Sequence, residues 1–333
     1  MKRKSTAPTM KDVALEAGVA LGTVSKVING VPVGDSYRRK VEEAIKKLNY
    51  QVNSYAQGLK AHRTNTVAFL VPNTTNPYFA TLTHYVNLSL MKRNYRMLLC
   101  CTDFNPALEQ DYVSMVHKNQ VDGIIGMTYN PDLIVDENTP FVSIDRCLSP
   151  QIPCISSDNF AGGQLAAEKL ADLGCTHVAF MRIGSSLTNE PNKRKAGFEN
   201  GCLMRGLTFE SLLLDDGTPL EAFTDFLREH VRNGRMEFDG IFCGTDYYAV
   251  QVRNSLAELG FSVPGDVQLI GFDGVRMFPD SPLLCSTIVQ PVEDIAQLCV
   301  DFVLQEGMAT KPPLICLPVR YEAGGTTREE TDS

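Results

Sequence analysis

The side chains that most often perform chemistry are scattered along this chain. None of the ten cysteines precedes Cys100, there is no CxxC pair, and the five histidines are too widely spaced to form a metal-binding motif. No GxGxxG or GxxxxGK[ST] loop follows a predicted strand, and no nucleophile–base set is visible. The sequence therefore disfavours an enzyme, and we expect no metal and no cofactor.

The cysteines and the first residues indicate a reducing compartment. Most of the cysteines stand singly in apolar segments, such as ICLPV around Cys316, and Cys100 and Cys101 fall in an expected strand that points them to opposite faces. The start MKRKSTAPTMKDVA is basic but lacks the apolar run of a signal peptide. No stretch of about 18 uncharged apolar residues occurs. We expect a cytoplasmic protein with reduced thiols and no membrane partner.

Charge is distributed unevenly between the two ends of the chain. Residues 1–63 contain 12 Lys and Arg and 5 Asp and Glu, a net charge of +7. The remainder has a net charge of −15. A basic head on an acidic body is the pattern expected of a chain that binds nucleic acid at one end, although basic tails also have other uses.

Two short helices joined by a glycine-containing turn are predicted in the basic segment. Thr9 is a suitable N-cap, and Asp12 completes a start that resembles a capping box. Gly18 is placed to end the first helix, and a second helix is predicted over Leu21–Asn29, with Gly30 as its stop. This arrangement is typical of the helix-turn-helix motif, whose second helix enters the major groove of DNA.

A third helix is predicted over Ser36–Leu48. Its apolar stripe consists of Val41, Ala44, Ile45 and Leu48, and basic residues cover its other faces. On this pattern alone, a generic three-helix bundle with a solvated basic face stays open as an alternative.

Four sequence motifs carry a resemblance that favours the first interpretation. They are MKDVA at 10–14, AGV at 17–19, TVSKVING at 23–30, and KVEEAI at 40–45 with LNY at 48–50. Nearly without gaps over about fifty residues, this pattern resembles the head of the lactose-repressor (LacI/GalR) family. The resemblance implies a sequence-specific transcriptional regulator, most simply a repressor, with residues 1–50 as its DNA-binding head.

The resemblance also implies which side chains contact double-stranded operator DNA. The base-reading positions are occupied by Leu21, Gly22 and Lys26. The phosphate-holding positions are occupied by Thr23, Ser25 and Asn29, and Thr9 completes the expected set in the head. The chemistry agrees, because lysine can donate to guanine O6 and N7 while hydroxyl and amide groups hold the DNA backbone.

Two base-reading positions depart from the family pattern. Lys26 stands where arginine is common, so that a point charge replaces a bidentate fork. Gly22 has no side chain, and discrimination there must come from DNA shape or from neighbouring residues. Glycine also destabilises this helix by roughly 1 kcal/mol relative to alanine.

Residues 51–65 correspond to the hinge helix and linker of the family. The resemblance implies that the hinge pairs with its twofold mate and inserts Leu59 into the minor groove, which kinks the DNA. Val52 stands where proline is favoured, and Gly58 lies inside the short helix, so that hinge stability is in doubt. A plain linker helix whose leucine packs on the core is the alternative. The expected DNA contacts of the hinge are Asn53, Ala56, Gln57 and Leu59.

After residue 66 the pattern alternates between short apolar runs and helical segments. This alternation predicts a mostly parallel, doubly wound α/β architecture with ligands at the carboxyl ends of the strands. The expected strands are 67–71, 97–102, 123–127, 141–144, 154–157, 177–181, 240–243, 267–272 and 286–289. The expected helices include 76–93, 160–173, 219–231 and 246–259.

The body also resembles the family core, which is similar to periplasmic sugar-binding proteins. The motifs that carry this resemblance are NPYF at 76–79, VDGII at 121–125, DN at 158–159, RKAGF at 194–198, GFD at 271–273 and GGTTR at 324–328. The implied fold is a small all-α helix-turn-helix head followed by a periplasmic-binding-protein-like core, 66–333, of two doubly wound parallel-sheet subdomains. With crossings near Ala161, Pro291 and Arg320, these subdomains are about 66–160 with 291–319, and 161–290 with 320–333.

A cleft for a polyhydroxylated ligand needs charged groups that form paired hydrogen bonds and an aromatic face. The resemblance implies that Arg194, Asp273 and Asp145 contact sugar hydroxyls. The further expected lining is Asn73, Phe79, Asp246 and Gln290. For three of these residues a simpler role is open: a helix N-cap for Asp246, a surface charge for Arg194 and core packing for Phe79.

We therefore expect a homodimeric DNA-binding regulator whose operator affinity depends on a small, sugar-like effector. A dimer matches the half-sites of a pseudo-palindromic operator, and the tail EETDS is too short for a tetramer-forming helix. The alternatives are a catabolite-control-type regulator that answers to a phosphorylated carrier protein and a solute-binding protein without a regulatory role. The short side chains at 20–22 keep the first of these open. Thr245, where asparagine is common, puts a standard hexose pattern in doubt.

Overall fold

The computed structural model describes residues 8–28, 30–50, 64–118, 121–184, 189–278, 280–305 and 313–329. By its internal contacts the chain separates into two compact units, Met1–Thr64 and Asn65–Ser333. We call them the head and the body. In the described part of the chain, no helix is long and apolar enough to cross a membrane.

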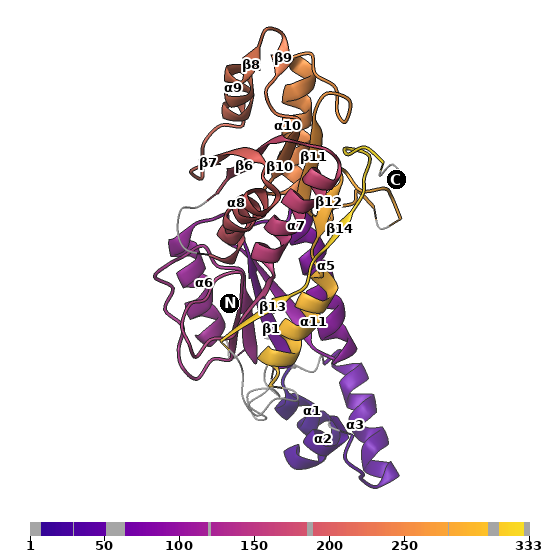
Figure 1. Cartoon of the computed structure of the whole chain (residues 1–333). Helices are drawn as coiled ribbons and strands as arrows, with labels where there is room; N and C mark the ends of the chain where they lie inside the picture. Colours follow the sequence, from indigo (N-terminus) through magenta and orange to yellow (C-terminus); the bar gives the residue numbers. More distant parts are fainter. Residues whose placement is uncertain are drawn as a thin grey trace, which may run out of the picture. The chain divides into compact units, whose positions relative to one another are not determined.

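In its described residues the head has three helices: α1 (Met10–Ala17), α2 (Leu21–Ile28) and α3 (Asp35–Lys47) (Figure 1). Val13, Val24 and Val41, one from each helix, are fully buried against one another in its core. The predicted capping box at the start of α1 is confirmed. The predicted end of α1 at Gly18 is also confirmed, because Gly18 has a left-handed conformation with a φ of 63°.

The body contains two six-stranded sheets. The first, here called the N-sheet, has the order β13-β5-β4-β3-β1-β2 and is parallel throughout. Its strands are β1 (Thr66–Val71), β2 (Arg96–Cys101), β3 (Gly123–Gly126), β4 (Phe141–Ile144), β5 (Cys154–Ser157) and β13 (Leu314–Leu317).

The second sheet, the C-sheet, has the order β14-β12-β11-β10-β6-β7 and is parallel except for β14. Its strands are β6 (His177–Ile183), β7 (Thr208–Leu214), β10 (Gly240–Cys243), β11 (Gln268–Asp273), β12 (Thr287–Val289) and β14 (Arg320–Glu322). A small antiparallel pair, β8 (Val231–Arg232) and β9 (Arg235–Met236), stands apart from it.

Helices cover both faces of each sheet because side chains alternate along a strand. In β1, Phe69 packs with α5 (Pro77–Lys92) and α11 (Val292–Val303), whereas Leu70 packs with α6 (Pro106–Lys118) on the other face. In β6, Met181 packs with α9 (Glu221–Glu229) and α10 (Asp246–Glu258), and Phe180 packs with α7 (Asn159–Asp172) and α8 (Lys193–Arg205). The predicted doubly wound α/β class is confirmed.

The chain passes between the two sheets three times (Figure 1). The first passage is at residue 158, between β5 and α7, and the second is at 290–291, between β12 and α11. The third is at 318–319, between β13 and β14. Each subdomain is therefore assembled from segments that are far apart in the sequence.

Candidate functional sites

Helix α2 turns its predicted DNA-contacting residues away from the core of the head. Val24 is fully buried, whereas Gly22 and Lys26 are exposed and Leu21 has 42% of its surface exposed. Thr23 and Ser25 are half-buried between these two faces. An exposed leucine and an exposed lysine on the solvent side of this helix suit contact with bases, because the leucine would lie on apolar base atoms such as the thymine methyl group.

Thr9 already has a structural role. Its side chain caps α1 by accepting from the Asp12 amide, and its own hydroxyl and amide donate to Asp12 Oδ2 at 2.7 Å each. The side-chain and backbone hydrogen bonds of Thr9 lower the pKa of Asp12. A phosphate contact by Thr9 stays a prediction. Asn29 and the four hinge residues Asn53, Ala56, Gln57 and Leu59 lie outside the described residues.

A cavity of about 160 Å³ lies between the carboxyl ends of the two sheets in the body, as expected for parallel strands. One water needs about 10–15 Å³, so a cavity of this size has room for roughly ten water-sized groups, enough for a monosaccharide with its substituents. Five of the predicted effector residues line it: Phe79, Asp145, Arg194, Asp273 and Gln290. Their role in binding an effector stays a prediction.

Arg194 is the most firmly held cation of the cavity. It lies in the first turn of α8 with 4% of its surface exposed. Its Nε donates to Asn159 Oδ1 at 2.7 Å, and its Nη1 donates to the Gly244 carbonyl at 2.6 Å. The guanidinium carbon lies 3.6 Å from the centre of the Phe272 ring, which adds a cation–π contact. Arg194 is therefore not a surface charge.

Two glycines set the position of Arg194 by letting α7 and α8 cross closely. A Cβ atom at Gly163 would lie 2.1 Å from the Arg194 carbonyl oxygen, and one at Gly197 would lie 2.0 Å from the Phe160 carbonyl oxygen. Both distances are far shorter than a van der Waals contact, so the crossing requires glycine at both positions. The close crossing brings the first turn of α8 to the cavity.

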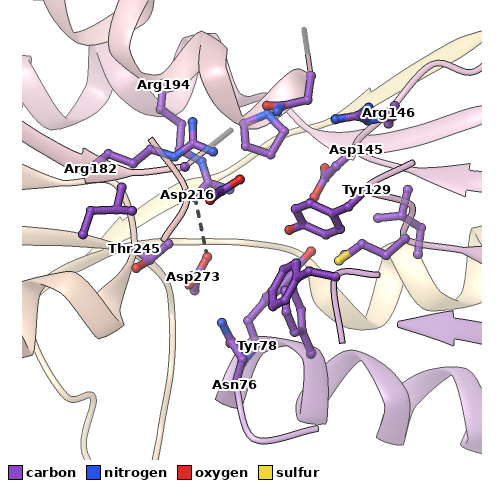
Figure 2. Close-up of a pocket in the computed structure, with 18 of the residues that line it drawn as sticks. Asn76, Tyr78, Tyr129, Asp145, Arg146, Arg182, Arg194, Asp216, Thr245 and Asp273 are labelled. Atoms are coloured by element: carbon purple, nitrogen blue, oxygen red, sulfur yellow. Dashed lines mark hydrogen bonds and ion pairs between the residues drawn. The ribbon is translucent and has the colours of Figure 1, made fainter. Parts of the chain in front are cut away.

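Asp273 ends β11 in a left-handed conformation with a φ of 130°. Its Oδ1 lies 3.8 Å from Arg194 Nη1, the ion pair drawn in Figure 2. The same oxygen accepts from Gln290 Nε2 at 2.7 Å, and Gln290 Oε1 accepts from the Ser157 hydroxyl at 2.7 Å. Burial raises the pKa of Asp273 to about 8, and Arg194 opposes that shift. This chain of contacts joins the ends of the two sheets.

Asp145 follows β4, also in a left-handed conformation with a φ of 62°. Its Oδ1 accepts from the Ser156 hydroxyl at 2.6 Å, and its carbonyl accepts from the Glu190 amide at 2.9 Å. Burial raises its pKa, while the bond from Ser156 opposes the shift. The strained backbone turns this carboxyl group into the cavity rather than along the strand.

Two predicted effector residues do not line the cavity. Asp246 is fully buried, where its oxygens accept from the Val275 amide at 2.6 Å and the Thr287 hydroxyl at 2.5 Å. It is not the N-cap of α10 either, because Thr245 holds that position and lines the cavity itself. Asn73 accepts from the amides of Thr75 and Asn76 in the turn before α5.

Several cavity residues were not predicted from the sequence. Most of them stand at the carboxyl end of a strand or shortly after it, which is the signal that could have revealed them. They include Tyr129 after β3, Arg146 after β4, Arg182 near the end of β6 and Asp216 after β7. In Figure 2, Arg146 lies on the side of Asp145 and Tyr129, and Arg182 lies on the side of Thr245.

Comparison with known proteins identifies the family. Residues 9–53 match the model described as bacterial regulatory proteins, lacI family, and residues 167–327 match the periplasmic binding protein-like domain. The sucrose operon repressor of Pediococcus pentosaceus is 33% identical over 334 residues, which cover 96% of this chain and 99% of that protein. The chain belongs to the lacI family of bacterial regulatory proteins.

Other members of the lacI family match over nearly the whole chain. The ribose operon repressor of Bacillus subtilis (strain 168) is 30% identical over 97% of this chain and 99% of that protein. The crystal structure of the lac repressor dimer bound to operator and the anti-inducer ONPF has the same fold. Its TM-score is 0.79 at 21% identity, and the match covers 97% of this chain and all of that chain. The head is therefore the DNA-binding part of a transcriptional regulator.

Proposed function

We propose that this regulator is a repressor that binds operator DNA as a homodimer and that a polyhydroxylated small molecule in the body cavity changes its operator affinity. The observation that supports the effector most directly is the Arg194–Asp273 pair at the cavity wall, with Asp145 and Gln290 beside it. Buried guanidinium and carboxyl groups can donate to and accept from the hydroxyl groups of one sugar, and Phe79 offers an aromatic face to its C–H groups.

The proposed mechanism is a shift between two conformations. The cavity is bounded by both sheets, and Gln290 and Asp145 contact residues across the two subdomains. A ligand that binds one arrangement of the subdomains more tightly favours that arrangement. Operator affinity then changes by the ratio of the two ligand affinities. The ligand is bound and released unchanged, without a catalytic step.

The test uses the full chain, a labelled DNA fragment selected by the protein from a random pool, and a panel of monosaccharides and their phosphates. We expect at least one compound to change DNA affinity, as measured by fluorescence anisotropy. Arg194→Lys should reduce this response at least tenfold, because lysine cannot hold Asn159, Gly244 and Asp273 with one fork.

Arg205→Lys is the matched control, because Arg205 lies on the same helix α8 but pairs with Asp172 on the surface. This variant should respond as the wild type does. A normal response of Arg194→Lys would contradict the assignment of the cavity. A protein that binds DNA but answers to no compound of the panel would contradict the sugar effector and leave DNA binding untouched.

A further inference from the structure

Arg146 is a buried cation whose Nε has no hydrogen-bond partner among the residues that the structure describes. It lies two residues after β4, lines the cavity and has 6% of its surface exposed. Its Nε is buried and makes no hydrogen bond to any residue that the structure describes. Arg194 is buried to the same degree, yet it has two hydrogen bonds, an ion pair and an aromatic contact.

A buried guanidinium N–H without a hydrogen-bond partner is unfavourable, so a ligand that accepts from it would be stabilised. The nearby carboxyl group of Glu109 is not such a partner. Burial raises the pKa of Glu109, and the charge of Arg146 opposes this shift. No ion pair within 4 Å joins the two residues in the described part of the body. Glu109 Oε1 is itself a buried atom without a hydrogen bond in that part of the chain.

A second arginine of the cavity bonds to a neutral partner. Arg182 has 9% of its surface exposed, and its Nη1 donates to the amide oxygen of Asn192 at 2.6 Å rather than to a carboxylate. Burial raises the pKa of Asp145, the carboxyl group next to Arg146 in the sequence, which favours its neutral form. Burial lowers the pKa of Arg182, and the nearby charge of Arg194 lowers it further, because two cations repel each other.

We propose that the effector is a phosphorylated monosaccharide whose phosphate group is bound by Arg146. This inference rests on the proposed function, because it specifies the ligand of the same cavity. The planar guanidinium fork of arginine matches the oxygens of a phosphate group, and such a bond would satisfy the unpaired Nε. The sugar ring then lies toward Arg194 and Asp273, the pair expected to hold its hydroxyl groups.

Calorimetric titration of the full chain tests this assignment. The probes are glucose and fructose, their 6-phosphates, and inorganic phosphate. We expect one hexose phosphate to bind at least tenfold more tightly than its parent hexose and than inorganic phosphate. Arg146→Gln should remove most of this preference for the phosphorylated form. Arg205→Gln, the surface control on α8, should retain it.

The ratio of the affinity for the hexose phosphate to that for the hexose separates phosphate binding from a purely structural role. A general loss of stability would weaken the binding of both sugars alike. Arg146→Lys, which keeps the charge but not the fork, should retain part of the preference. The inference would be overturned if the hexose and its phosphate bound equally tightly, or if inorganic phosphate bound as tightly as the hexose phosphate. Either result would still leave a ligand in the cavity. A preference lost in Arg182→Gln but kept in Arg146→Gln would also overturn it.

Discussion

At the scale of single residues, the cavity carboxyl groups differ from ordinary surface acids in their protonation. Burial raises the pKa of Asp273 to about 8, although Arg194 Nη1 lies 3.8 Å away. In the unfolded chain an aspartate has a pKa of about 4. The folded protein thus keeps a proton on Asp273 that the unfolded chain has already lost. This contribution to the free energy of unfolding is complete below about pH 4 and is lost as the pH rises to 8.

We therefore expect Asp273→Asn to flatten the decrease in stability between about pH 5 and pH 8. One proton accounts for at most about 1.4 kcal/mol per pH unit. Urea unfolding of the full chain at a series of pH values measures this slope. Asp225→Asn, a change at an exposed ion pair on α9, is the control and should leave the slope as it is. An unchanged slope in the Asp273 variant would show that its carboxyl group is ionised in the folded protein.

At the scale of elements, two glycines in the head should respond in opposite ways to the same substitution. Gly22 lies inside α2 with no atom within 4 Å of an added Cβ, so alanine should stabilise the helix by about 0.5–1 kcal/mol. Gly18 ends α1 with a φ of 63°, where alanine should destabilise the head by about 1 kcal/mol.

Hydrogen exchange of the α1 and α2 amides in the full chain measures both effects. Protection should rise in Gly22→Ala and fall in Gly18→Ala relative to the wild type. If both substitutions reduced protection, the open space at Gly22 would not describe the folded head.

Elements with a strong local pattern were predicted well. The nine expected strands of the body are present, with ends within two residues of those expected. Five strands of the described residues went unpredicted: β8 and β9 form the small separate pair, and β7, β13 and β14 lie at sheet edges. An edge strand is covered on fewer sides. The three edge strands contain exposed or half-buried residues throughout, so their apolar pattern is weak.

The cavity was harder to predict because its residues meet only after folding. Arg194 and Asp273 stand in motifs that resemblance could identify, and both line the cavity. Asp246 is also an aspartate, but at the start of α10 its carboxyl group accepts from the Val275 amide and the Thr287 hydroxyl instead of lining the cavity. Arg146 belongs to no recognisable motif. Its importance becomes visible only when burial and the missing partner of its Nε are known.

At the scale of the whole molecule, the two units carry net charges of opposite sign. The head has a net charge of +7 and the body a net charge of −15, so attraction to DNA belongs to the head. A body ligand changes DNA affinity only if it distinguishes between conformations that hold the heads differently, because a ligand with equal affinity for both shifts nothing. Coupling between the cavity and the head is therefore measurable as the ratio of the operator affinities with and without the ligand.

We expect the effector to change operator affinity by roughly 5- to 150-fold, the range of ordinary allosteric coupling. Because linkage is reciprocal, operator DNA should change the affinity for the effector by the same factor. Anisotropy titrations with and without effector give the first factor, and calorimetry with and without operator gives the second. Arg205→Lys should preserve both factors, and Arg194→Lys should bring both toward one. A compound that raises the melting temperature of the body but leaves operator affinity unchanged would show that the cavity binds a ligand without regulating the head.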